Sequence, residues 1–208
     1  MSSTLSIQPS SEPSSTVSGD PSSTSLGDPS STPLSDPSSR TFSFVGFRPV
    51  EEKDLPCLFA WHQLPHVQQW WDLEPSEVFA NWDLFVATYH HKMACPWQRL
   101  FIVYAQGQPI GYVQYYDVNQ DQRFAQPPGT VGIDIFIGQT SFLGKGYGGR
   151  ILRQLLDELK KDPSITKIVI DPHVQNVRAI RCYEKAGFRL ERIIMPEQVY
   201  LMSMQLDR

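Results

Sequence analysis

The segment Thr130–Gly138, "TVGIDIFIG", restricts the possible folds most, because it combines a strand pattern with a single carboxylate. With a period of two residues, one face carries only β-branched side chains, those of Val131, Ile133, Ile135 and Ile137. The other face carries Asp134. A strand rich in isoleucine is expected to be buried, and an unpaired ionised carboxylate there would cost several kcal/mol. Two interpretations are open: a structural Arg or Lys neutralises Asp134, or the carboxylate has a function.

A glycine-rich loop follows this strand and leads into an amphipathic helix. The loop is "GKGYGG", Gly144 to Gly149. The helix is predicted from one apolar stripe, which consists of Ile151, Leu152, Leu155, Leu156 and Leu159. Free backbone amides and the positive end of the helix dipole meet at such a start. The sequence therefore predicts an anion site between strand and helix.

Three interpretations of the glycine loop follow from spacing alone. A nucleotide-triphosphate loop fits poorly, because five residues instead of four separate Gly138 from Gly144 and no Ser or Thr follows Lys145. A dinucleotide fingerprint matches formally, with Asp171 about twenty residues further on, but only 37 residues remain after Asp171 for the rest of a doubly wound sheet. If the loop is only a connecting turn, the presence of so many glycines, which weaken the start of a helix, has no explanation.

The remaining patterns predict a mixed α/β domain, an α+β arrangement with a mixed sheet. The expected order is a strand at 42–49, helices at 51–64 and 76–92, a hairpin at 99–118, a strand at 130–138, a helix around 151–159, a strand at 166–170, a helix at 176–187 and a strand at 199–206. Residues 65–75 and 119–129 are expected to form loops. This order requires at least one right-handed crossover.

The first 41 residues differ in composition from the rest of the chain. They consist mostly of Ser, Pro, Thr and Gly and repeat with a period of eight from Glu12, as in "DPSSTSLG" and "DPSSTPLS". A segment with so little apolar surface cannot offset the entropy of ordering. We expect residues 1–41 to be a disordered tail or linker, with a binding motif as the alternative, and residues 42–208 to form the folded domain.

Charge and apolar runs exclude several classes of protein. The net charge is −4, and four acids and one arginine in the tail leave about −1 for the domain, which does not suggest nucleic-acid binding. No apolar run approaches the ~20 residues that span a bilayer, and the N-terminus lacks the features of a signal peptide. Cys57, Cys95 and Cys182 have no zinc or disulfide spacing. These features predict a cytoplasmic protein without membrane contact.

Two motifs resemble those of the GCN5-related N-acetyltransferases: "LGKGYGGRIL" and, about thirty residues later, "NVRAIRCYEKAGF". The resemblance implies a fold with a splayed central sheet, in which loop amides hold the pyrophosphate of acetyl-coenzyme A and the preceding strand admits the pantetheine arm. The family usually has Gln or Arg where this chain has Leu143. The implied cofactor residues are Ile135, Phe136, Ile137, Leu143, Gly144, Lys145, Gly146, Tyr147, Gly148, Gly149, Asn176 and Tyr183.

Longer stretches resemble the aminoglycoside 6′-N-acetyltransferases over roughly Phe42 to Leu206. These are "GIDIFIGQTSFLGKGYG", "DPHVQNVRAIRCYEKAGF", "IGYVQYYD" and "WW". That subgroup also tends to carry Leu at the Gln/Arg position. The implied substrate contacts are Trp70, Trp71, Tyr116, Asp121, Asp134, Asp171 and Glu197, of which Asp121 and Glu197 are loosely aligned. Flat indole faces suit a sugar or a cation, and carboxylates pair with ammonium groups. The double Trp as core and Asp171-Pro172 as a strand-end turn are the structural alternatives.

The resemblance implies that Asp134 and Tyr183 are the catalytic residues. An Asp of pKa ~3.9 is a weak base for an amine, so Asp134 is expected to position the amine as much as to accept its proton. Tyr183 corresponds to a tyrosine near the thioester sulfur. A phenol of pKa ~10 is expected to donate a hydrogen bond to a thiol of pKa ~8.5 rather than its proton. A core tyrosine is the alternative, and Asn176 is expected to hold either pantetheine or the adjoining backbone.

The sequence thus predicts a monomeric or homodimeric enzyme that acetylates the 6′-amine of an aminoglycoside by direct attack in a ternary complex. No metal is expected, because His90, His91 and Cys95 have no fourth ligand at suitable spacing. One alternative is another amine, such as hydroxylysine in siderophore assembly or a peptide amine. Siderophore-type relatives usually rely on a His near the acceptor, and "TVGIDIFIG" contains none. The other alternative is a non-catalytic acyl-coenzyme A sensor.

Overall fold

The structure, a computed structural model, describes residues 45–71, 76–121, 125–195 and 198–206. All of them belong to one unit, Thr41–Arg208. The predicted tail, residues 1–41, lies outside the described residues, as does the predicted start of the first strand at Phe42.

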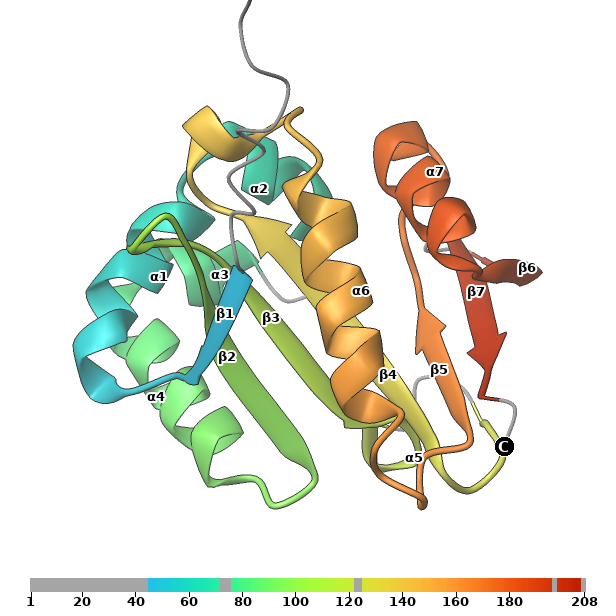
Figure 1. Ribbon diagram of the computed structural model, residues 1–208. Coiled ribbons are helices and arrows are strands. Elements are labelled where there is room, and N and C mark those ends of the chain that lie inside the picture. Colours follow the sequence, from blue (N-terminus) through green and yellow to red (C-terminus); the bar gives the residue numbers. More distant parts are fainter. Residues whose placement is uncertain (1–44, 72–75, 122–124, 196–197, 207–208) are drawn as a thin grey trace, which may run out of the picture. The chain divides into compact units, whose positions relative to one another are not determined.

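The described elements are strands and helices in a mixed order (Figure 1). The strands are β1 (Val45–Pro49), β2 (Gln98–Ala105), β3 (Gln108–Asp117), β4 (Thr130–Ile137), β5 (Lys167–Ile170), β6 (Arg189–Ile194) and β7 (Val199–Gln205). The α-helices are α1 (Leu55–His62), α2 (Pro65–Trp71), α3 (Ser76–Ala80), α4 (Trp82–Ala94), α5 (Val118–Asp121), α6 (Tyr147–Leu159) and α7 (Val177–Ala186). Two short 3-10 helices are η1 (Glu52–Asp54) and η2 (Thr140–Phe142).

The strands described here form one mixed sheet in the order β1-β2-β3-β4-β5-β7-β6. Neighbouring strands are antiparallel except β4 and β5, which are parallel and are joined through α6. Figure 1 shows β4 and β5 starting together and separating toward their C-terminal ends. The predicted mixed α/β fold with a crossover is therefore confirmed.

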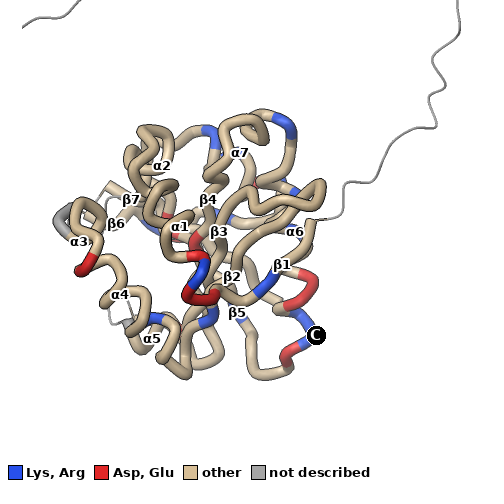
Figure 2. The backbone as a smooth tube through the Cα atoms, turned by 90° about the vertical axis from the view of Figure 1, so that its left-hand side faces the viewer, with Lys and Arg blue, Asp and Glu red and all other residues tan. Residues whose placement is uncertain are grey.

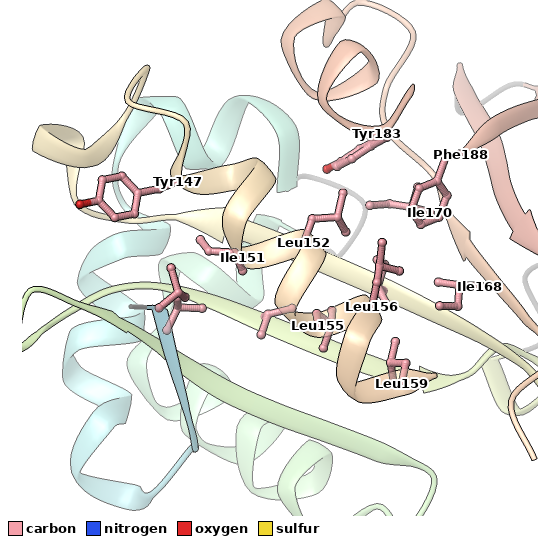
Figure 3. Packing of buried hydrophobic residues seen from close by; sticks show 14 of the residues in the cluster. Tyr147, Ile151, Leu152, Leu155, Leu156, Leu159, Ile168, Ile170, Tyr183 and Phe188 are labelled. Atoms are coloured by element: carbon pink, nitrogen blue, oxygen red, sulfur yellow. The ribbon is translucent and has the colours of Figure 1, made fainter. Parts of the chain in front are cut away.

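Helices cover both faces of the sheet. The apolar stripe of α6 packs with α7 against the face that carries Val131 and Ile133, as predicted from the period of two (Figure 3). The opposite face, which carries Tyr112 and Phe136, packs against α1, α2, α3 and α4. Because β4 is buried on both faces, its side chains are fixed in position, which is what a site on this strand requires.

Four expectations about elements were wrong in part. Residues 65–71, expected as a loop, form α2, which starts at Pro65 and buries Val67. The single helix expected at 76–92 is two helices, because Asn81 is extended and its side chain accepts hydrogen bonds from the amides of Asp83 and Leu84, which starts α4. Residues 119–121, expected in a loop, belong to α5, which begins at Val118, the expected end of the hairpin. The edge strand β6 was missed, because its exposed charged residues and a register shift after Leu190 hide the alternation.

Charged residues of both signs are interspersed in the described fold (Figure 2). They alternate most closely in the segment that joins β1 to α1, where Arg48 forms ion pairs with Glu51 and Asp54 at 3.0 and 2.6 Å. The three cysteines are free thiols. Among the helices that the structure describes, none is long and apolar enough to cross a bilayer.

His62 lies in the aromatic core between the sheet and α1–α4. Its ring stacks on Phe79 with centroids 4.3 Å apart, and its Nε2 shares a hydrogen bond with the hydroxyl of Tyr89 at 2.9 Å. Only 1% of the residue is exposed. Burial, with a smaller contribution from the charge of Lys92, lowers the pKa of His62 to about 3. The folded protein therefore keeps this imidazole neutral.

We predict that His62 makes the protein acid-sensitive. Below pH ~6.5 His62 is protonated in the unfolded chain but not in the folded chain. The free energy of unfolding therefore decreases as the pH falls from ~6.5 toward 3, by up to ~1.4 kcal/mol per pH unit. Urea unfolding between pH 7.5 and 5.0 should show a shallower pH slope for His62→Leu than for the wild type. His90→Leu, at an exposed histidine, is the control. Equal slopes for wild type and His62→Leu would contradict the prediction.

Candidate active site

The site lies where the sheet divides between β4 and β5. The two strands pair only from Thr130–Lys167 to Gly132–Val169, whereas β4 stays paired with β3 through Ile137. Within the described chain, no strand pairs with the β5-facing edge of β4 beyond Gly132. Its backbone groups from Ile133 to Phe136 can therefore bind an extended, amide-containing ligand as a strand would.

The loop between β4 and α6 presents backbone amides at the same end of the division. Gly144 and Gly146 have φ of 76° and 80°, a conformation that glycine adopts without strain. Gly146 caps α6, and the first helical hydrogen bond runs from the amide of Arg150 to Gly146. The amides of Tyr147, Gly148 and Gly149 precede that bond and face outward with the positive end of the dipole. This arrangement fits a pyrophosphate group.

Side chains around the glycine loop add positive charge and line a small pocket. The guanidinium of Arg178 on α7 comes within 3.9 Å of the point where a Cβ on Gly144 would lie. Lys145 lines a pocket of about 160 Å³ together with Gln106, Gln108, Ser141, Phe142 and Tyr147. A ligand site typically measures ~300–1,000 Å³, so this pocket is large enough for only part of a ligand.

Asp134 lies two residues beyond the last β4–β5 pair and is half-buried. Its Oδ2 accepts a hydrogen bond from Nε2 of Gln114, its cross-strand neighbour on β3, at 2.5 Å. Gln114 is neutral, so this hydrogen bond orients the carboxylate without neutralising it. Asp134 is therefore held at the division of the sheet as a hydrogen-bond acceptor.

Tyr183 projects from α7 toward α6 on the other side of the division (Figure 3). The residue is buried, with 9% exposed. Burial raises the pKa of Tyr183 far above its ordinary value, and the charges of Cys182, Asp134 and Asp171 raise it further. The phenol therefore keeps its proton at neutral pH. Because Asp134 and Asp171 both act on the pKa of Tyr183, each of them lies within electrostatic range of the phenol.

The two tryptophans of α2 have different roles. Trp71 is a core residue, with its ring 4.9 Å from Phe136 and 5.9 Å from Tyr112. Trp70 is half-buried and lies 6.0 Å from the ring of His173, in the segment after β5. Trp70 and His173 thus approach each other from the two halves of the sheet. Asp171 lies two residues before His173 in the chain and is half-buried.

A family model for an acetyltransferase (GNAT) domain matches residues 50–195, which is more than half of the chain. The chain belongs to the GNAT acetyltransferase family. GNAT enzymes use acetyl-coenzyme A. The open edge of β4 and the free amides of α6 fit the two parts of that molecule, its amide-containing arm and its pyrophosphate.

The comparisons also find relatives whose activities are named. Aminoglycoside N(6')-acetyltransferase type 1 of Klebsiella pneumoniae is 36% identical over 151 residues, covering 69% of this chain and 73% of that protein. Spermidine N(1)-acetyltransferase of Escherichia coli (strain K12) is 29% identical over 157 residues, covering 74% and 77%. A solved structure of AAC(6')-Ib in complex with paromomycin and acetyl-coenzyme A has a TM-score of 0.68 and 32% identity, covering 77% and 93%.

Several residues predicted for this GNAT site have clear structural roles. The side chain of Asn176 caps α7 by accepting a hydrogen bond from the amide of Ala179 at 3.2 Å, so it does hold the adjoining backbone. Tyr116 is buried against Gly132 and Val169. Asp121 is the last residue of α5. Glu197 lies outside the described residues. Contacts of these four residues with cofactor or substrate stay predictions.

Three residues near the site were missed from sequence: Gln114, His173 and Arg178. Gln114 could have been found from the register of β3 with β4, which places it opposite Asp134. His173 and Arg178 lie within the stretch "DPHVQNVRAIRCYEKAGF", but their approach to the site depends on how α2 and α7 pack. The histidines and cysteine considered for a metal are engaged otherwise: His90 pairs with Glu52 at 2.6 Å, and His91 lies 3.7 Å from Cys95.

We predict that Gly146→Ala weakens acetyl-coenzyme A binding about tenfold, because a side chain at φ of 80° costs ~1–2 kcal/mol and relaxation turns the α6 amides. Gly107→Ala is the matched control. Gly107 has a similar φ of 75°, and a Cβ at either glycine meets nothing within 4 Å. Calorimetric titration with coenzyme A should separate the two variants, whereas their melting temperatures should fall alike. Equal Kd values for both would contradict an anion site at α6.

Proposed function

We propose that this protein transfers the acetyl group of acetyl-coenzyme A to the 6′-amine of an aminoglycoside, by direct attack in a ternary complex. The observation that carries the proposal is that Asp134 and Tyr183 lie at the division of the sheet within electrostatic range, with the Asp134 carboxylate as a hydrogen-bond acceptor and Tyr183 as a protonated donor. The similarity to aminoglycoside N(6')-acetyltransferase type 1 supports the choice of amine.

Acetyl-coenzyme A supplies a thioester carbonyl as the acyl donor. The amides of Tyr147, Gly148 and Gly149 are proposed to hold its pyrophosphate, with Arg178 and Lys145 adding positive charge nearby. The edge of β4 from Ile135 to Ile137 is proposed to bind its amide-containing arm. Leu143 is half-buried before the loop and contributes packing rather than charge.

Asp134 is proposed to prepare the amine. A primary ammonium group must lose a proton before its nitrogen can attack a carbonyl, and a carboxylate within hydrogen-bond reach can accept that proton directly or through one water. A carboxylate also holds the nitrogen lone pair in the direction of attack, which is worth several kcal/mol when the geometry is close to that of the reaction. Because Asp is a weak base, the positioning role is the larger one.

Tyr183 is proposed to donate a hydrogen bond from its hydroxyl to the sulfur of the leaving thiol. Burial raises its pKa, so complete transfer of the phenolic proton to a thiolate is unfavourable. A hydrogen bond stabilises the developing negative charge without that cost. The raised pKa therefore supports the role of hydrogen-bond donor over that of proton donor.

Recognition of the antibiotic is proposed to rest on negative charge and a flat ring. Asp134 and Asp171 each lie within electrostatic range of Tyr183, and both can pair with ammonium groups of a polyamine sugar. Trp70 offers an indole face near His173 for a sugar ring. Trp71, Tyr116, Asp121 and Glu197 stay predicted substrate contacts. We further propose a cytoplasmic enzyme, monomeric or homodimeric, that binds no nucleic acid.

We predict release of free thiol from acetyl-coenzyme A with neomycin and kanamycin but not with paromomycin, which carries a hydroxyl in place of neomycin's 6′-amine. A thiol-reactive dye measures the release. Hydroxylysine and spermidine complete the panel, the latter because a spermidine acetyltransferase is 29% identical. Release with spermidine or hydroxylysine alone would replace the proposed substrate. Coenzyme A binding without release on any amine would favour the sensor role.

We predict that Asp134→Asn lowers kcat about 100-fold, because the variant keeps the shape of the side chain but loses the negative charge that positions the ammonium group and accepts its proton. The Kd of acetyl-coenzyme A should change less than twofold. Asp117→Asn is the control, since Asp117 lies on β3 and accepts a hydrogen bond from the amide of Asn119, away from the division. Wild-type activity of Asp134→Asn would remove Asp134 from the mechanism.

A further inference from the structure

A buried chain of hydrogen bonds stands behind Asp134. Gln114 donates from Nε2 to Asp134 Oδ2 at 2.5 Å. Its Oε1 accepts two hydrogen bonds, from the hydroxyl of Tyr112 at 2.7 Å and from Nε2 of Gln98 at 3.0 Å. Gln98, Tyr112 and Gln114 are all buried, with at most 8% of each residue exposed. Three strands, β2, β3 and β4, therefore contribute to one network that ends at the carboxylate.

The chemistry of this network fixes which way the Gln114 amide points. A carboxylate only accepts hydrogen bonds, so the amide atom facing an ionised Asp134 must be the NH₂ group. The carbonyl oxygen then faces Tyr112 and Gln98, both of which can donate. Turning the amide over would place two oxygens 2.5 Å apart and would place the NH₂ groups of Gln98 and Gln114 together. The network is therefore consistent with only one orientation of Gln114 beside a charged Asp134.

We propose that Gln114 is the positioning residue of the active site: held by Tyr112 and Gln98, it fixes the rotation of the Asp134 carboxylate toward the incoming amine. This inference rests on the proposed function of Asp134. The neutrality of Gln114 is part of the role. A lysine or arginine at this position would form an ion pair with Asp134 and compete with the substrate ammonium, whereas an amide orients the carboxylate without adding a positive charge.

A merely structural role makes a different prediction. A buried glutamine that only satisfies its neighbours affects stability when it is replaced, and any loss of activity is then independent of Asp134. A positioning residue acts through Asp134, so its replacement should matter only while Asp134 can accept a proton. A double-mutant cycle separates the two cases.

The first experiment measures kcat and KM for Gln114→Met in the wild-type and Asp134→Asn backgrounds. We expect kcat to fall about tenfold in the wild-type background and less than twofold in the Asp134→Asn background, with the KM of kanamycin within twofold. Gln126→Met is the matched control, because Gln126 accepts a hydrogen bond from Lys167 at 2.8 Å at the far end of β4. An equal fall in both backgrounds, or no fall, would overturn the proposal. Tyr112→Phe, which removes one donor to Gln114, should give a smaller fall and serves if Gln114→Met does not fold.

The second experiment does not depend on turnover. Carbon-detected NMR of the Asp134 carboxyl group follows its titration in wild type and Gln114→Met, or Tyr112→Phe. A hydrogen bond donated to a carboxylate favours its charged form, so loss of the donor should move the midpoint up by about half a pH unit or more. An unchanged midpoint would contradict the proposal. If the enzyme acetylates none of the amines but shows this shift of the midpoint, the proposed function is wrong and the hydrogen bond from Gln114 to Asp134 is still supported.

Gln114→Met leaves the other titratable groups near this part of the sheet in place, whereas Tyr112→Phe removes one of them. These groups are Tyr112 of β3, His66 of α2, Tyr183 of α7 and Asp171 after β5.

Discussion

The pairing of β4 determines the rest of the site. On one side β4 is hydrogen-bonded to β3 along its whole length, and on the other it pairs with β5 over only three residues, Thr130 to Gly132. A strand held firmly on one edge and released on the other stays straight while its neighbour diverges. Asp134 lies two residues past the last pair, so it reaches the opening without leaving the ordered sheet. The same divergence lets α6 direct its N-terminal amides at the opening.

The predictions from sequence succeeded where one element carries a complete local signal. The period of two in β4, the apolar stripe of α6 and the capped ends of α7 are each readable within about ten residues. They failed where burial and tertiary packing decide. β6 is an exposed edge strand without an apolar face, and α2 exists because Val67 and Trp71 pack on a core assembled from distant segments.

The candidate site was predictable to a similar extent. Asp134, Tyr183 and the glycine loop sit in motifs, and the structure brings them to one division of the sheet. Gln114, Arg178 and His173 reach the site only through strand register or helix packing, which a single sequence does not encode locally. The double Trp shows the limit most clearly, since adjacent identical residues of similar burial have different neighbours: Trp71 packs on Phe136, and Trp70 lies next to His173.

The charges around the opening explain why its polar residues are of these types. A carboxylate that serves a cationic amine must be oriented and yet remain charged, which requires a neutral donor such as Gln114 rather than a cation. The phenol of Tyr183 stays protonated, because burial and the charges of Asp134 and Asp171 raise its pKa. The positive charges, Arg178 and Lys145, lie instead at the glycine loop, where an anion would bind. Opposite charges are thus separated along one opening, which is the arrangement that the proposed cationic acceptor and phosphorylated donor would require.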